Sequence, residues 1–203
     1  MSKIAIDIVL LPEESAMDAV IQANRRLLED DPGQIVLDKQ NCLPHVSLAM
    51  GCLDQADIRR AGEALAEVAA KQSIGTLRAI GIYTAHHGDG RKVSSLAIER
   101  DPHIVSLHEA IMDRFEPLLS YDVWPEMLVH PDEVAESSLQ WIANYRDQSS
   151  FDNFFPHITL GYGKCGIVDM PRDIAASKLA ICHLGNHCTC RRVLAAIDLS
   201  DSF

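Results

Sequence analysis

The chain has 203 residues, of which 47% are hydrophobic and 23% are charged, as in an ordinary globular protein of one large domain or two small lobes. It carries 18 Lys and Arg against 29 Asp and Glu, so its formal net charge is -11. This charge repels polyanions at long range and excludes an extended nucleic-acid surface. A small phosphorylated nucleotide, or the end of an RNA strand, is compatible with it.

Residues 1–8 contain an early Asp7 and alternate afterwards, which predicts a strand and not a signal peptide. No run reaches the roughly 18 apolar residues that a membrane span needs. Six cysteines in a chain without a secretory signal are expected to stay thiols. We therefore expect a cytoplasmic monomer that makes no membrane contact.

The spacing of apolar residues predicts the elements, since helices repeat them every three or four positions and strands every second position. In chain order these are a strand at 3–11, a helix at 13–29 with a stop at 30–33, strands at 35–37 and 45–50, a helix at 55–70, a hairpin of 77–84 and 92–99, helices at 103–119 and 133–145, a strand at 158–162, and a hairpin of 178–184 and 193–199. This order favours an α+β protein with antiparallel sheets over a doubly wound parallel sheet.

One short motif occurs twice, as PHVSL at residues 44–48 and as PHITL at residues 156–160. The composition leads us to expect roughly 0.2 matches to His-x-Ser/Thr-aliphatic by chance, so two copies argue for a shared role. The two copies suggest two similar lobes, each of which presents one motif strand.

Side chains alternate between the two faces of a strand, so His45 and Ser47 should share a face, as should His157 and Thr159. If the two faces meet, one neutral imidazole can accept a proton from a nucleophile while the other, protonated, gives one to a leaving oxygen. The two hydroxyls can donate to phosphate oxygens. A single histidine of this kind is more simply explained as a satisfied polar group at a strand end; the duplication argues against that.

The motifs at 44–48 and 156–162 (PHITLGY) resemble those of the 2H phosphoesterase superfamily. The most similar type is the LigT-like RNA 2′,3′-cyclic phosphodiesterase, or 2′-5′ RNA ligase, family. The resemblance implies a bilobal α+β fold in which two antiparallel sheets with flanking helices are related by a pseudo-two-fold around a central cleft. It also implies hydrolysis of a 2′,3′-cyclic phosphate, an ADP-ribose cyclic phosphate or a 2′-5′ linkage without metal or other cofactor.

Carried over to this chain, the resemblance implies that His45 and His157 are catalytic and that Ser47 and Thr159 bind phosphate. Which histidine is the base stays open, because a two-fold makes the two equivalent. Two alternatives also stay open: a module that binds a nucleotide or RNA end without turnover, and an RNA 2′-5′ ligase, which the acidic charge disfavours.

Further residues are candidate substrate contacts, above all Tyr162, Lys92 and Trp141. Base stacking could also use Trp124, Tyr83 or Phe155. Other basic residues near the predicted site are Lys39 and Arg91, which are more simply explained as solvated turn residues.

A dense cluster of soft ligands raises the question of zinc. It consists of Cys182, His183, His187, Cys188 and Cys190. Residues of a tight hairpin would alternate between opposite faces, and no second Cys pair closes a tetrahedral shell, so no metal is expected. The pair His86 and His87 is expected in an exposed turn.

Overall fold

The computed structural model describes residues 2–30, 35–86, 90–166 and 170–199. Within these ranges the elements, in chain order, are β1 (Lys3–Pro12), α1 (Glu14–Asp30), β2 (Val46–Asp54), α2 (Ile58–Ala69), β3 (Leu77–His86), β4 (Lys92–Ile98), α3 (Pro102–Phe115), β5 (Leu119–Ser120), α4 (Glu136–Gln148), β6 (His157–Tyr162), β7 (Asp173–Ile174), β8 (Ala176–Gly185) and β9 (Thr189–Asp198). Short 3-10 helices that matter below are η4 (Phe151–Asn153) and η5 (Asn186–Cys188). No helix in the described ranges has the length and apolar character needed to cross a bilayer.

The strands form one continuous sheet in the order β7-β3-β4-β6-β2-β1-β8-β9, with β5 paired to β2. Every named pair is antiparallel, which confirms the predicted α+β class. The predicted division into two sheets is not confirmed. The physical reason is that the two motif strands pair with each other, Val46 opposite Ile158, so each half satisfies the edge of the other.

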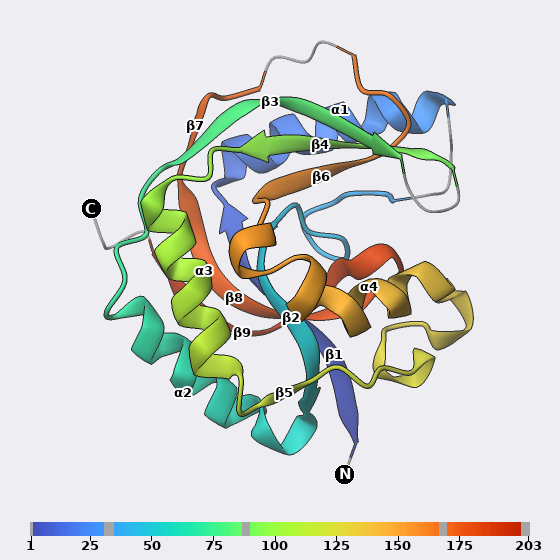
Figure 1. Cartoon of the computed structure of the whole chain (residues 1–203). Helices are drawn as coiled ribbons and strands as arrows, with labels where there is room; N and C mark the ends of the chain where they lie inside the picture. Colours follow the sequence, from blue (N-terminus) through green and yellow to red (C-terminus); the bar gives the residue numbers. More distant parts are fainter. Residues whose placement is uncertain (1, 31–34, 87–89, 167–169, 200–203) are drawn as a thin grey trace.

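The helices divide between the two halves of this curved sheet (Figure 1). Helix α1 packs against β6, while α2 and α3 lie side by side, with α3 against β2 and α2 against β8 and β9. Helix α4 packs against β2 and η5. The paired motif strands β2 and β6 therefore lie at the centre of the sheet, with helices packed around them.

The pairing of β1 with β2 contains a bulge next to the first motif. Val9 lies opposite Ser47, and Ile8 lies opposite Ala49, so that Leu48 is the extra residue on β2. A bulge of this kind bends its strand and re-aims the neighbouring side chains.

The pairing of β4 with β6 contains the same bulge next to the second motif. Ser95 lies opposite Thr159, and Ser94 lies opposite Gly161, so that Leu160 is the extra residue on β6. The internal repeat seen in the sequence is therefore also a repeat of backbone pairing. It extends from the motif to the neighbouring strand in each half.

The strand predicted at 35–37 is wrong, because those residues lie in an irregular segment. A side chain replaces the missing strand partner: the Asn24 amide donates to the carbonyl oxygens of Ile35 (2.7 Å) and Leu160 (2.8 Å). The Leu37 N–H donates to the Asn24 carbonyl oxygen at 2.9 Å. These backbone groups are thus satisfied without a ladder.

The helix predicted at 103–119 ends at Phe115, as expected where Pro117 follows; residues 116–118 form a turn, and Leu119 begins the two-residue strand β5. The first motif strand continues to Asp54 instead of stopping at residue 50. Strand β9 begins at Thr189, and η5 connects it to β8 where a tight turn was predicted. Of the two histidines expected in an exposed turn, His86 is instead the last residue of β3, and His87 lies outside the described residues.

Candidate functional site

The two motif histidines are held in the same way. His45 Nδ1 lies 2.7 Å from the carbonyl oxygen of Leu43, and His157 Nδ1 lies 2.8 Å from that of Phe155. Because a carbonyl can only accept, Nδ1 carries the proton in each neutral ring and Nε2 keeps its lone pair. Both imidazoles therefore present an Nε2 atom that can accept a proton or, once protonated, donate one.

The sheet brings the two motifs onto neighbouring strands. Since β2 and β6 run antiparallel with Val46 opposite Ile158, His45 extends toward Thr159 on the partner strand. The proximity of His157 also contributes to the low pKa of His45. The predicted convergence of two imidazoles thus has a structural basis, while the roles of the side chains stay predictions.

A buried aspartate, which sequence reasoning missed, lies beside the first motif. Asp7 of β1 is fully buried, and its Oδ2 accepts a 2.6 Å hydrogen bond from the Ser47 hydroxyl. His45 Nε2 lies 3.6 Å from the same oxygen, and Asp7 Oδ1 has no hydrogen-bond partner in the described chain. The sequence did carry a signal, since Asp7 is the only charged residue among the apolar residues 4–11. A buried carboxyl needs a partner or a proton.

Burial governs the ionisation of all three groups. It raises the pKa of Asp7 well above its usual value, against the smaller lowering effect of the Ser47 hydrogen bond. It lowers the pKa of His45 to about 4, with a raising contribution from the Leu43 carbonyl and a lowering one from His157. It also lowers the pKa of His157, which the Phe155 carbonyl partly offsets. Burial therefore favours the neutral form of both groups, a protonated carboxyl at Asp7 and an uncharged imidazole at His45.

The two motif hydroxyls differ in what they bind. The Ser47 hydrogen is directed at Asp7, so it is already in use. Thr159 is half-buried, and in the described chain its hydroxyl makes no hydrogen bond. Of the two predicted phosphate donors, Thr159 is the one that can donate to a ligand without giving up an internal bond.

A third histidine, His187, which the sequence offered only as part of the cysteine-rich cluster, contacts Tyr162 at the end of β6. The Tyr162 hydroxyl is 3.1 Å from His187 Nδ1, and the Arg91 guanidinium carbon lies 3.9 Å from the centre of the Tyr162 ring. His187 has a φ of 57°, a left-handed conformation that is uncommon outside glycine. Tyr162 is largely buried in this group, so the predicted substrate contact is held in place by its neighbours.

An aromatic surface adjoins His157. Phe155 packs on the His157 ring with centroids 5.5 Å apart and an interplanar angle of 26°, and Tyr83 meets Phe155 edge-on at 5.5 Å. Tyr83 is 53% exposed and Phe155 is 46% exposed. Exposed rings of this size can stack on a nucleobase.

The remaining predicted contacts do not join the motif residues in the described chain. Lys39 forms ion pairs with Glu14 and Asp18 at 3.0 and 2.7 Å. Lys92 is exposed at the start of β4, and Trp141 is half-exposed on α4; neither forms a hydrogen bond or ion pair with a motif residue.

The cysteine-rich hairpin does not gather its donors at one point. All six cysteines are free thiols. His183 Nε2 is hydrogen-bonded to the Met127 carbonyl oxygen, and His187 Nδ1 is hydrogen-bonded to the Tyr162 hydroxyl. A closer group is formed by donor atoms of Asp7, His45 and Cys190, which lie within 4.8 Å of one another. The His45 Nε2 and Asp7 Oδ2 atoms of this group lie 3.6 Å apart, which is too far for a hydrogen bond but within the range of an ion pair. A cation in this place would take the Nε2 lone pair that proton transfer requires.

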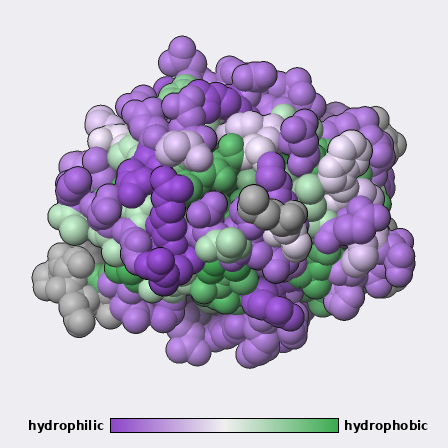
Figure 2. Space-filling model, turned by 90° about the horizontal axis from the view of Figure 1, so that it is seen from below, coloured by the Kyte–Doolittle hydropathy of each residue, from purple (hydrophilic) through white to green (hydrophobic). Residues whose placement is uncertain are grey.

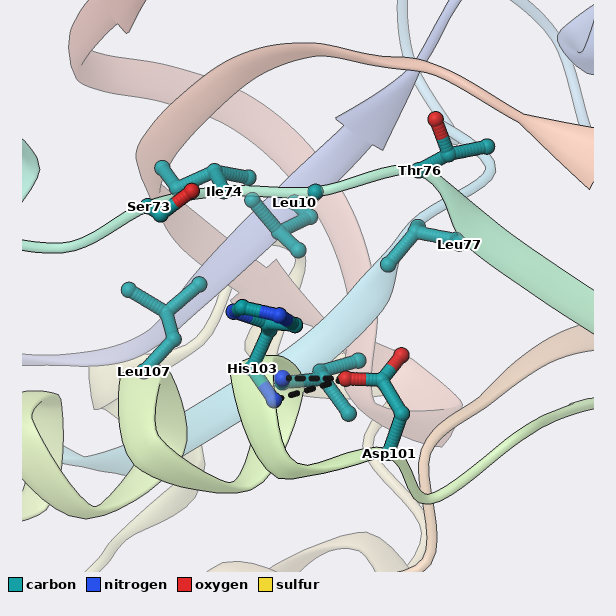
Figure 3. A pocket seen from close by; sticks show the side chains of 10 residues that line it. Leu10, Ser73, Ile74, Thr76, Leu77, Asp101, His103 and Leu107 are labelled. Atoms are coloured by element: carbon teal, nitrogen blue, oxygen red, sulfur yellow. Dashed lines mark hydrogen bonds between the residues drawn. The ribbon is translucent and has the colours of Figure 1, made fainter.

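A cavity of about 270 Å³ lies elsewhere, between residues 73–77 and the start of α3 (Figure 3). Its carboxylate, Asp101, is used to cap the helix, accepting from the backbone N–H groups of His103 at 2.7 Å and Ile104 at 3.1 Å. A wider, open groove of about 750 Å³ runs along β3 and residues 164–166. Neither contains a motif residue. Figure 2 shows that the face seen from below is mostly hydrophilic, with hydrophobic residues in small separate areas.

The chain is similar in fold to a solved structure. The crystal structure of E. coli LigT in its apo form matches the chain with a TM-score of 0.54 and 14% sequence identity, over 98% of this chain and 98% of that one. No protein-family model matches the chain, and no curated protein matches it. At this identity the likeness shows the fold, which the chain shares with LigT over nearly its whole length.

Proposed function

We propose that the chain is a metal-independent phosphodiesterase of the 2H type that opens a 2′,3′-cyclic phosphate or a related small nucleotide ester. The single observation that carries the proposal is the pair of identically held imidazoles on neighbouring central strands. The LigT-like fold supports the same reaction class.

In the reaction, water attacks phosphorus and gives its proton to Nε2 of one histidine. The phosphorus bond to the ribose oxygen breaks, and that oxygen takes a proton from Nε2 of the other histidine, which leaves a phosphomonoester. The Thr159 hydroxyl donates to a non-bridging oxygen, whose charge changes in the transition state. Each Nδ1 bond to a carbonyl keeps its ring oriented throughout.

The exposed aromatic surface of Tyr83 and Phe155 favours a substrate with a base beside the phosphate. The net charge of -11 disfavours a long polyanion, since counterion release on a broad basic face would be missing. Both point to a mononucleotide or a strand end. They also favour hydrolysis over ligation, which must hold two RNA ends together.

The test compares His45→Ala and His157→Ala on nucleoside 2′,3′-cyclic phosphates, ADP-ribose cyclic phosphate and 2′-5′ oligoadenylate, all with a chelator present. Each variant should lose about 10²-fold or more in kcat, as for an essential proton-transfer group. His103→Ala, an exposed histidine on α3, is the matched control and should keep full activity. If both motif variants stay active, the mechanism is wrong. Binding of a cyclic nucleotide without product from the unaltered protein would favour a binding module instead.

A further inference from the structure

The backbone repeat makes one difference between the halves stand out. Continuing from the duplicated bulge, Asp7 lies opposite Met50 on β2, and its counterpart, Val93, lies opposite Tyr162 on β6. The strand next to the first motif therefore carries a carboxyl group, that of Asp7, at the position where the strand next to the second motif carries the isopropyl group of Val93. The counterparts at the next two positions also differ, Ile8 against Ser94 and Val9 against Ser95, but of the three positions only that of Asp7 carries a carboxyl group in one half.

The surroundings of Asp7 offer no cation to balance a charge. The groups that face it are the His45 imidazole and the Ser47 hydroxyl, with the Tyr145 hydroxyl of α4 and the thiols of Cys188 and Cys190 close enough to affect it or be affected by it. No lysine or arginine of the described residues forms an ion pair with it. A proton is thus the simplest partner for the pair of acceptors, Oδ2 and Nε2, that lie 3.6 Å apart.

We propose that Asp7 is a positioning residue that supplies and holds the proton of His45, so that His45 is the general acid and His157 the general base. The inference rests on the proposed function and deepens it. No carboxyl accompanies His157, which enters the reaction neutral and takes the proton of the attacking water.

The proton count closes over one turnover. Asp7 and His45 begin with one shared proton, which reaches the leaving ribose oxygen through Nε2 as the phosphorus–oxygen bond breaks. The water proton arrives at His157 Nε2. Asp7 is left ionised, with Ser47 donating to it at 2.6 Å, which gives that hydroxyl a task other than direct phosphate binding. Exchange with solvent then moves one proton from His157 back to the Asp7–His45 pair.

The test is the pH dependence of kcat/KM for a nucleoside 2′,3′-cyclic phosphate in two variants with opposite expectations. Asp7→Asn removes the shared proton, so the alkaline limb should move to lower pH by about 1 unit or more, while the acid limb stays in place. Ser47→Ala removes the hydrogen bond that lowers the pKa of Asp7, so the alkaline limb should move to higher pH. A merely structural role would not shift one limb in opposite directions. Val93→Thr, the isosteric change at the counterpart position, should leave both limbs unchanged.

A second arm uses a cyclic substrate in which sulfur replaces the bridging oxygen of the bond that breaks. Thiolate leaves without a proton, so this substrate should restore turnover in His45→Ala and Asp7→Asn but not in His157→Ala.

The outcomes separate the inference from the function beneath it. Movement of the acid limb in Asp7→Asn, or sulfur rescue of His157→Ala, would assign the base to His45 and overturn the inference while leaving the proposed function intact. Loss of activity on chelation would point to a metal ion in place of a proton, which overturns the inference and the metal-independent mechanism together. Absence of turnover in the unaltered protein would defeat the proposed function itself.

Discussion

The two halves of the sheet share one backbone arrangement around their motif histidines, but the side chains that surround the two histidines differ. Both hold a histidine by a carbonyl two residues earlier, and both bulge at the leucine that follows the hydroxyl residue. Around His45, however, the neighbours are a buried carboxyl and thiols, and around His157 they are exposed aromatic rings. The comparison teaches that the repeated backbone sets where the two imidazoles lie, while side chains outside the repeat give each of them different surroundings.

The largest expected effect comes from the residue that joins the halves. His108 of α3 is buried; its Nδ1 lies 2.6 Å from the Leu48 carbonyl on β2, and its Nε2 accepts from the Phe151 N–H at 2.8 Å, just before the second motif. His108→Phe keeps a ring to stack on Phe154 but leaves both backbone groups unpaired. The free energy of unfolding should fall by about 2–4 kcal/mol in urea denaturation at neutral pH. His103→Phe, exposed on the same helix, should change it by no more than about 0.5 kcal/mol.

The same residue should make the protein sensitive to acid. Burial lowers the pKa of His108 to about 4, so the folded chain stays unprotonated there while the unfolded chain takes up a proton below about pH 6.5. Stability should therefore fall as the pH drops from 6.5 to 4, by up to about 3 kcal/mol from this residue. Unfolding curves across that range should show a shallower fall in His108→Phe than in the unaltered protein. Equal falls in the two would contradict the assignment.

The bulge positions after the leucines offer a paired test of the halves. Gly161 has a φ of 137°, and a Cβ there would lie 2.9 Å from the Asn24 amide nitrogen that bonds the Leu160 carbonyl. Gly161→Ala should cost about 2–3 kcal/mol through strain and the displaced amide. Its counterpart change, Ala49→Gly, should cost only about 1 kcal/mol, from chain entropy and lost burial. If thermal unfolding shows similar losses of stability in the two variants, the backbone difference between Gly161 and Ala49 does not contribute to stability.

The hydroxyls provide a comparison in kinetics. Thr159→Val should lower kcat/KM about 10- to 100-fold, because it removes a donor that the described chain leaves for the phosphate. Ser47→Ala should lower it less at the optimum pH, since that hydroxyl serves Asp7. If the two variants lose kcat/KM to the same extent and neither changes the pH profile, Ser47 and Thr159 have the same role, as the repeated motif alone suggests.

The repeated His-x-hydroxyl motif is visible in the sequence itself. The spacing of apolar residues predicted the antiparallel α+β class and most elements, because this spacing is a local pattern. It could not predict that the halves share one sheet, since the single pair of Val46 with Ile158 depends on how the strand edges meet. Nor did spacing reveal that Asn24 replaces a strand at 35–37, a long-range bond of one side chain. The isolated Asp7 in an apolar strand was visible, but its partners lie 38 and 40 residues further along the chain.

The Asp7–His45 pair should also affect the pH dependence of stability. The raised pKa of Asp7 makes stability fall as the pH rises above about 4, and the lowered pKa of His45 makes it rise between about pH 4 and 6.5, so the two cancel in that window. If the pair keeps its proton above pH 6.5, as the proposal requires, only the Asp7 contribution remains there, because the unfolded chain then holds no proton at either residue. Stability should decline there by up to about 1.4 kcal/mol per pH unit. Asp7→Asn should abolish this decline and uncover an added loss between pH 6.5 and 4 from His45. A decline that persists in the variant would show that the pair does not retain its proton, and the distinction between the two histidines would lose its basis.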